Sequence, residues 1–140
     1  MSVTITLTIF YKITLQQPNE LFVAIRKGRD LLACDTAFYQ SGNSDPLVKL
    51  KINGVSKKTK YIPNTLNPTW DEVFVFPAII DISLSLELTC YDYDGPMKSD
   101  LIGKCIIPIR NFRDKKPHSQ WYKLGDKYGE VCSDMNSLGC

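Results

Sequence analysis

The chain has 140 residues, of which 44% are hydrophobic and 23% charged, with a net charge of +2. This composition is typical of one globular domain and excludes collagen-like and coiled-coil classes. No apolar run approaches the ~20 residues that a membrane-spanning helix needs, and residues 1–4 predict neither a signal peptide nor N-myristoylation. We therefore expect a soluble domain without its own membrane anchor.

Alternating apolar and polar residues predict strands along most of the chain. The predicted strands cover residues 3–14, 21–25, 47–52, 55–61, 73–76, 84–90, 102–109 and 121–124. Asn53-Gly54 predicts a tight hairpin, and a helical turn is possible between 109 and 121. Short strands separated by turn residues indicate a β-sandwich or barrel over 1–125. Residues 126–140 have little periodicity and are expected to form a loosely ordered tail.

Five cysteines stand at irregular spacing, and none forms a C-x-x-C pair. This pattern gives no support for a zinc ribbon. Cys90 and Cys105 lie inside apolar runs, where a free thiol behaves as a small hydrophobic side chain. We interpret the cysteines as reduced thiols, which is typical of a cytoplasmic protein.

Aspartates gather at the predicted ends of strands. Asp92, Asp94 and Asp100 surround one loop, and Asp35 and Asp45 belong to a second loop. If the two loops are neighbours, five carboxylates converge and repel one another, each close pair by ~1 kcal/mol in water. Ca²⁺ relieves such repulsion because it binds six to eight oxygen ligands, whereas Zn²⁺ prefers His or Cys. The alternative is that these are ordinary turn aspartates.

Lysines form a stripe on the predicted hairpin. A two-residue turn at Asn53-Gly54 places Lys49 opposite Lys58 and Leu47 opposite Lys60. Alternation adds Lys51 to the same face and sends Lys57 to the other. The stripe is either a solvated strand face that discourages edge-to-edge aggregation or a binding surface for an anionic ligand.

Several segments, in order, resemble the C2 domain family from about Thr4 to Leu124. The similar segments are LACD (32–35), SDPLVKL (44–50), TLNPTWDE (65–72), YDYD (91–94) followed by DLIG (100–103), and WYKL (121–124). The resemblance implies an all-β, eight-stranded antiparallel Greek-key β-sandwich with calcium-binding loops at one end. The long first strand resembles the strand order of synaptotagmins and conventional protein kinase C.

The resemblance also implies roles for particular residues. The Ca²⁺ ligands would be the five carboxylates, helped by the main-chain carbonyls of Cys34 and Tyr93; they are Asp35, Asp45, Asp92, Asp94 and Asp100. The lysine stripe would bind phosphoinositide headgroups, with Tyr91 as an aromatic neighbour; its members are Lys49, Lys51, Lys58 and Lys60. The first loop, Thr36 to Ser44, is longer than usual in the family.

Phe38 and Tyr39 stand in the middle of that long loop. They either pack over the end of the sandwich or insert into a membrane interface, where aromatic rings with a polar edge are favoured. We expect them at the loop tip, inserting when calcium binds.

The leading functional prediction is calcium-dependent binding to anionic phospholipid membranes, by a cytoplasmic protein that becomes peripheral to the membrane when calcium rises. A protein-interaction module of the same fold, with calcium structural or absent, is the alternative. We expect no enzyme, because the sequence shows no poised base or nucleophile. We expect no nucleic-acid partner, because the stripe lacks Arg and the net charge is small.

Overall fold

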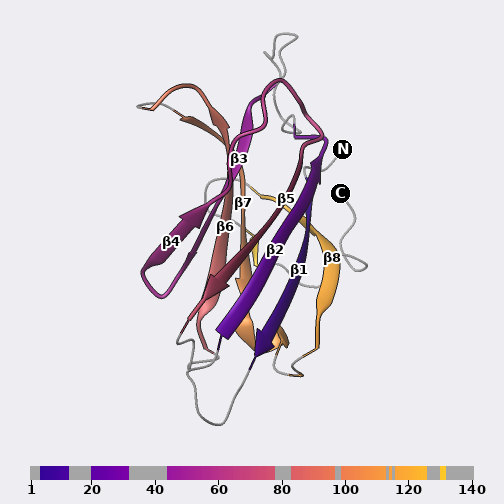
Figure 1. Cartoon of the computed structure of the whole chain (residues 1–140), viewed down its shortest axis with the longest axis vertical. Helices are drawn as coiled ribbons and strands as arrows, with labels where there is room; N and C mark the ends of the chain where they lie inside the picture. Colours follow the sequence, from indigo (N-terminus) through magenta and orange to yellow (C-terminus); the bar gives the residue numbers. More distant parts are fainter. Residues whose placement is uncertain are drawn as a thin grey trace.

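The computed structural model describes residues 4–12, 20–31, 44–77, 83–96, 99–112, 114, 116–125 and 130–131. Figure 1 shows two layers of strands packed face to face. The strands are β1 (Thr4–Lys12), β2 (Glu20–Arg29), β3 (Pro46–Ile52), β4 (Val55–Lys58), β5 (Thr69–Phe76), β6 (Ser85–Tyr93), β7 (Ser99–Pro108), β8 (His118–Lys123) and β9 (Glu130–Val131). One sheet has the order β5-β2-β1-β8, and the other has the order β4-β3-β6-β7-β9. The predicted β-sandwich is confirmed.

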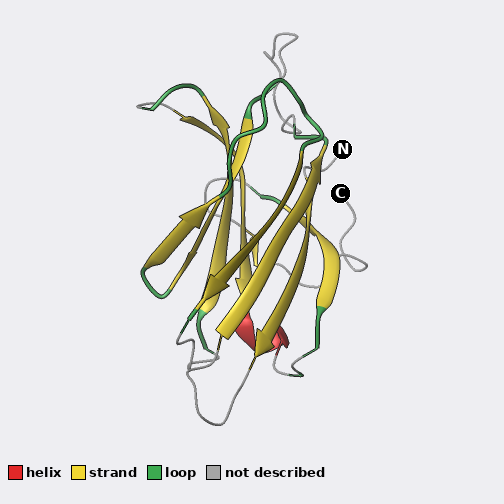
Figure 2. Cartoon of the chain, viewed as in Figure 1, coloured by secondary structure: helices red, strands yellow, loops and turns green. Residues whose placement is uncertain are grey.

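Strands make up most of the described chain, and one short 3-10 helix, η1 (Ile109–Phe112), lies before β8 (Figure 2). All eight predicted strands are present, and the helical turn lies where the sequence allowed one. Strand β9 was not predicted. It pairs in parallel with β7 and lies inside the segment expected to be a loose tail.

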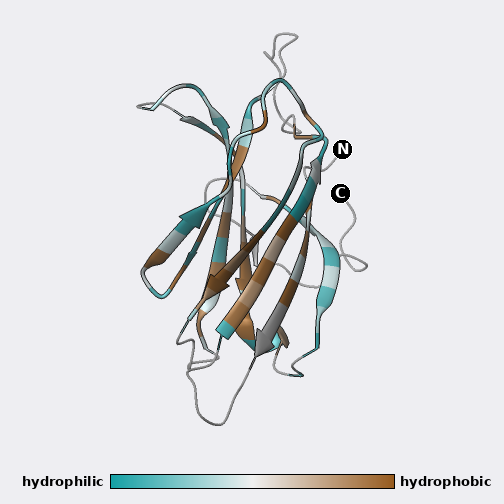
Figure 3. Cartoon of the chain, in the orientation of Figure 1, coloured by the Kyte–Doolittle hydropathy of each residue, from teal (hydrophilic) through white to brown (hydrophobic). Residues whose placement is uncertain are grey.

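The core lies between the two sheets and is built from inward-facing residues of β1, β2, β3, β5, β6, β7 and β8 (Figure 3). Val48, Leu50 and Ile52 are at most 1% exposed, whereas Lys49 and Lys51 between them are exposed. This alternation is the expected consequence of one buried and one solvated sheet face. It confirms that Lys49 and Lys51 project away from the core.

The cysteines differ from the expectation at one position. Cys90 is a buried free thiol, as predicted, and burial raises its pKa. Cys105 is also buried, but it is disulfide-bonded, and its partner lies outside the described residues. The interpretation of five reduced thiols is therefore wrong at Cys105. The reason is that pairing depends on which strands the fold brings together, which spacing in the sequence does not reveal.

Candidate functional site

The start of β3, the end of β6 and the start of β7 lie at one end of the sandwich, at the top of Figure 1, and four of the five predicted aspartate ligands lie at or next to these strand ends. Asp45 immediately precedes β3, Asp92 lies near the end of β6, and Asp100 lies near the start of β7. The sheet register places Asp92 opposite Asp100 on one side and opposite Pro46 on the other. The expected grouping of strand ends is therefore present for these residues. Asp35 lies outside the described residues.

Hydrogen bonds join the start of β3 to the end of β6. The Asp45 main-chain N–H donates to Asp92 Oδ1 at 2.9 Å, and the Tyr93 N–H donates to the Asp45 carbonyl at 2.9 Å. The Asp45 carboxylate accepts the Asn64 N–H at 2.7 Å. Each of the two carboxylates thus accepts a hydrogen bond from a backbone N–H, which fixes its orientation at this end.

The donor chemistry at this end suits Ca²⁺. The candidate ligands are all carboxylate oxygens, and Asp94 and Asp100 are exposed to solvent. Within the described ranges, however, no group of three or more Asp, Glu, His or Cys side chains is placed to hold a metal ion. The described aspartates therefore supply suitable donors but do not form a complete ion site by themselves.

The TLNPTW segment has a structural role at this end. The Thr65 N–H donates to the Ser44 carbonyl at 2.8 Å, and the Leu31 N–H donates to the Leu66 carbonyl at 3.1 Å. Main-chain hydrogen bonds from residues 65 and 66 therefore fix Ser44 and Leu31, the two described residues that flank segment 32–43. The buried Trp70 Nε1–H donates to the Pro46 carbonyl at 3.1 Å. This bond fixes the first residue of β3 directly after Asp45.

The β3–β4 hairpin carries the predicted lysines in nearly the predicted register. Lys49 lies opposite Lys58, and Lys51 lies opposite Ser56. Asn53 and Gly54 have φ values of 51° and 79°, as a two-residue hairpin turn with both central φ angles positive requires. Lys57 belongs to the other face, where its Nζ lies 5.7 Å from the centroid of the Phe76 ring. The register from Ile52–Val55 to Lys49–Lys58 is confirmed.

The register ends before Lys60. The Val48 N–H donates to the side-chain oxygen of Thr59 at 3.0 Å, and the Lys60 N–H donates to Glu72 Oε2 at 2.9 Å. The β3–β4 ladder therefore stops at Lys49–Lys58, and Leu47 does not pair with Lys60. Lys60 instead borders a hollow that is also lined by Leu47, Lys58 and Tyr61. The predicted pairing of Leu47 with Lys60 was therefore wrong, and the place of Lys60 in the lysine stripe stays a prediction.

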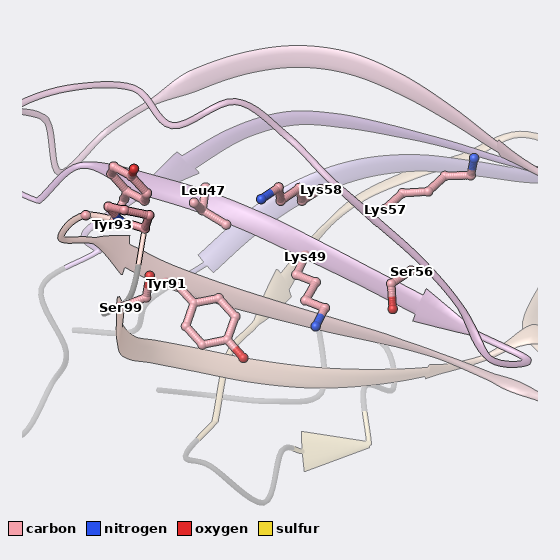
Figure 4. A pocket seen from close by; sticks show the side chains of 10 residues that line it. Leu47, Lys49, Ser56, Lys57, Lys58, Tyr91, Tyr93 and Ser99 are labelled. Carbon is pink, nitrogen blue, oxygen red and sulfur yellow. The ribbon is translucent and has the colours of Figure 1, made fainter.

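A hollow of about 580 Å³ lies beside Lys49 and Tyr91 on the outer face of the β4-β3-β6-β7 part of the sheet. Figure 4 shows Lys49 and Tyr91 next to each other on this face, with Lys57 directed away from them. Lys58, Tyr93 and residues 95, 96 and 99 complete much of its wall. The hollow combines cations with aromatic rings and so suits a ligand with anionic and ring-shaped parts.

The sequence analysis did not identify three residues of this surface, namely Lys104, Glu87 and Tyr61. Lys104 on β7 pairs with Thr89 on β6, which in turn pairs with Lys49, so both lysines reach the same sheet face. The Lys104 Nζ lies 2.8 Å from Glu87 Oε1. Tyr61 stacks on Tyr93 with ring centroids 4.4 Å apart and an interplanar angle of 11°.

The electrostatic environment of Glu87 is unusual for this face. Its pKa is lowered, first by the hydrogen bond from Lys104 and then by the charges of Lys104, Lys51 and Lys49, whereas burial opposes this lowering. Glu87 is therefore ionised at neutral pH. We define the lysine face as the outer-face cations and the acid among them, namely Lys49, Lys51, Lys58, Lys104 and Glu87.

None of the helices within the described residues is long and apolar enough to cross a membrane.

Comparison with protein families places this arrangement among known domains. The family described as C2 domain matches residues 19–124. Multiple C2 and transmembrane domain-containing protein 2 of Mus musculus is 42% identical over 106 residues, covering 76% of this chain but 12% of the mouse protein. Multiple C2 domain and transmembrane region protein 6 of Arabidopsis thaliana is 34% identical over 119 residues, covering 81% of this chain and 11% of the plant protein. The chain thus spans about a tenth of the length of these relatives.

Solved structures give the same result. The third C2 domain of KIAA1228 protein aligns with a TM-score of 0.71 and 26% identity, covering 92% of each chain. A C2 domain of RIM from Drosophila aligns with a TM-score of 0.69 over 89% of this chain and 98% of the RIM domain. At 20% identity, the second likeness concerns the fold alone.

Proposed function

The chain belongs to the C2 domain family, and from this premise we propose that it docks on anionic phospholipid membranes in a calcium-dependent manner. C2 modules dock on membranes or on other proteins, so the choice between these partners depends on the surfaces of this chain. Two surfaces of the chain favour a membrane as the partner. They are the lysine face and the carboxylate-bearing end beside it.

The observation that carries the proposal is the cross-strand array of lysines around the hollow. Lys49 and Lys58 are directly opposite each other, although like charges in that position destabilise a hairpin. Lys51 and Lys104 add to the same face. Each lysine near an anionic membrane contributes ~1 kcal/mol to binding, so the array supplies enough attraction for reversible docking. Tyr91 and the hollow beside Lys49 provide room for a phosphorylated headgroup.

The calcium dependence rests on the carboxylates. We assign all five as ligands on their oxygen chemistry; they are Asp35, Asp45, Asp92, Asp94 and Asp100. The grouped strand ends give further support for Asp45, Asp92 and Asp100. A bound Ca²⁺ would supply positive charge where these carboxylates otherwise repel lipid phosphates. The chain would then be cytoplasmic at low calcium and peripheral to the membrane when calcium rises.

The tip aromatics belong to the same proposal. Phe38 and Tyr39 lie outside the described residues and remain proposed membrane-inserting side chains. In Phe38→Trp, tryptophan emission should shift to the blue with calcium plus anionic vesicles, but not with calcium alone. The wild type, with Trp70 and Trp121, provides the blank. An equal shift with calcium alone would contradict insertion.

Vesicle co-sedimentation tests the proposed function. The wild type should pellet with vesicles that contain phosphatidylserine and phosphatidylinositol bisphosphate when calcium is present, and much less with a chelator. Lys49→Ala with Lys58→Ala should weaken this binding, whereas Lys27→Ala should leave it nearly unchanged because Lys27 lies on β2 in the other sheet. Equal losses in the two variants would show that general charge, and not the lysine face, is responsible.

A calcium titration tests the carboxylates separately. Calcium should raise the melting temperature of the wild type, because a ligand that binds only the folded state stabilises it. Asp45→Asn with Asp94→Asn should abolish this increase and leave the calcium-free protein at least as stable. If millimolar calcium leaves the melting temperature of the wild type unchanged and the protein still pellets with vesicles, the proposed membrane docking stands. The proposed calcium dependence is then contradicted.

The alternative function is a docking module for proteins. The Tyr61–Tyr93 stack favours it, because Tyr61 is 45% exposed and aromatic side chains are enriched in protein interfaces. If the wild type fails to pellet with any anionic vesicle, with or without calcium, this alternative replaces membrane docking.

A further inference from the structure

The lysine face contains an acid at a position where a ligand phosphate would otherwise find three cations. Glu87 lies opposite Lys51 in the β3–β6 ladder, and its Oε1 lies 2.8 Å from Lys104 Nζ. A second, smaller hollow of about 190 Å³ is bordered by Glu87 together with Lys49, Lys51 and Lys104. At ~30 Å³ for each water, this space holds a small anionic group with part of its hydration shell.

The two hollows adjoin, since Lys49 and Tyr91 border both. A ligand with one phosphate can therefore use the larger hollow alone. A ligand with two phosphates can extend past Lys49 toward Lys104, but there its second phosphate meets the Glu87 carboxylate. Both groups compete for the same ammonium, because Lys104 already donates a short charge-assisted hydrogen bond to Glu87.

We propose that Glu87 is a specificity-determining residue that fills a second anion subsite of the lysine face and thereby disfavours ligands with two or more phosphates. The inference rests on the proposed binding of anionic headgroups and adds a preference within that class. Glu87 remains a carboxylate throughout the pH range of a binding assay, because its pKa is lowered. Its charge therefore opposes an incoming phosphate at every relevant pH.

The size of the effect follows from Coulomb's law. A phosphate in the smaller hollow would lie ~6 Å from the Glu87 carboxylate, and at a surface site the effective dielectric is between about 20 and 80. A unit repulsion at that separation changes affinity by roughly 3-fold to 100-fold, and solvent exposure favours the lower part of this range. Glu87 and Lys104 side chains are 38% and 24% exposed, so we expect roughly a 5-fold effect.

Glu87→Gln tests the proposal, because it removes the charge and keeps an oxygen that can accept the Lys104 hydrogen bond. Glu20→Gln is the matched control. It makes the same change in net charge at the start of β2, in the other sheet. Calorimetry in calcium-free buffer should compare inositol 1-phosphate with inositol 1,4,5-trisphosphate, and vesicles that contain phosphatidylinositol bisphosphate test whether the lipid-borne headgroup behaves as the free one does.

Glu87→Gln should bind the trisphosphate about 5-fold more tightly than the wild type and bind the monophosphate with nearly unchanged affinity. Glu20→Gln should match the wild type for both ligands. Adding Lys104→Ala to Glu87→Gln should remove the gain, because the subsite then loses its nearest cation. The bisphosphate vesicles should follow the trisphosphate; a gain confined to the free ligand would restrict the subsite to soluble phosphates.

Two results would overturn the inference. One is a trisphosphate affinity that Glu87→Gln leaves unchanged or weakens, and the other is an equal gain for both ligands, which would indicate a general charge effect. If the wild type pellets with anionic vesicles in these cases, only the role of Glu87 fails. If neither the wild type nor Glu87→Gln binds any phosphate ligand or vesicle, the proposed function itself fails.

Discussion

Replacing Trp70 with Phe tests whether the indole fixes the start of β3. Trp70 is 6% exposed, and its Nε1–H donates to the Pro46 carbonyl at 3.1 Å. Phenylalanine removes this bond, which contributes ~1 kcal/mol net. It also leaves a gap against Gly28, over which the indole is closely packed, at a further cost of ~1–2 kcal/mol. The Pro46 carbonyl still accepts the Ile62 N–H at 3.1 Å, so it is not left without a partner.

The sum is a loss of about 2–3 kcal/mol in the free energy of unfolding. For a domain of this size it corresponds to a decrease of about 5–10 °C in melting temperature. Urea denaturation followed by circular dichroism measures the loss directly. Trp121→Phe is the matched control, because Trp121 is only partly buried and its ring faces the Arg29 guanidinium at 4.0 Å, a contact that contributes under ~1 kcal/mol at an exposed site. If both variants unfold at the same urea concentration, Trp70 does not have the structural role assigned to it.

Three further predictions concern stability and reactivity. Burial raises the pKa of Tyr122 to about 12 from 10.0, so the folded state favours the neutral phenol. The stability that comes from this preference is fully present below the unfolded pKa and is lost as pH rises through the folded pKa. Urea titrations should therefore show a less stable domain at about pH 11 than at about pH 8. Gly103→Ala should destabilise the domain by ~1–3 kcal/mol in urea, because its Cβ would lie 2.6 Å from Leu124 Cβ and 3.1 Å from the Gly125 carbonyl oxygen. Cys90 should resist alkylation by iodoacetamide until the protein unfolds, because burial raises its thiol pKa; modification of the native protein at the rate of an unfolded thiol would contradict this.

The hairpin shows how far local patterns predict the site. Asn53-Gly54 specifies the turn, and the turn specifies the register, so the pairing of Lys49 with Lys58 follows from the sequence. The same reasoning fails two residues later. The hydroxyl of Thr59 accepts the Val48 N–H in place of a strand carbonyl, and a side-chain hydrogen bond that ends a ladder leaves no periodic signal.

Contacts between strands far apart in the sequence were beyond pattern analysis. The approach of Glu87 to Lys104 depends on the β6–β7 register, which shifts between Cys90 and Tyr91. Counted from the loop that connects β6 to β7, this irregularity moves every pairing beyond it by one residue. Strand β9 has only two residues, too few to show alternation. Its parallel pairing with β7 is therefore visible only in the structure.

The acidic end and the lysine face share strands β3 and β6, but their mutual electrostatic influence is small. Lys49 is four residues beyond Asp45, which at ~3.3 Å per residue is ~13 Å along the strand. The screening length at physiological ionic strength is ~8 Å, so a charge change at Asp45 is largely screened at Lys49. Tyr91 directly precedes Asp92, and successive side chains of a strand point to opposite faces. Long-range electrostatics should therefore couple calcium and headgroup binding only weakly, and the coupling that exists should pass through residues 95, 96 and 99, which lie between Asp94 and Asp100 and also line the larger hollow.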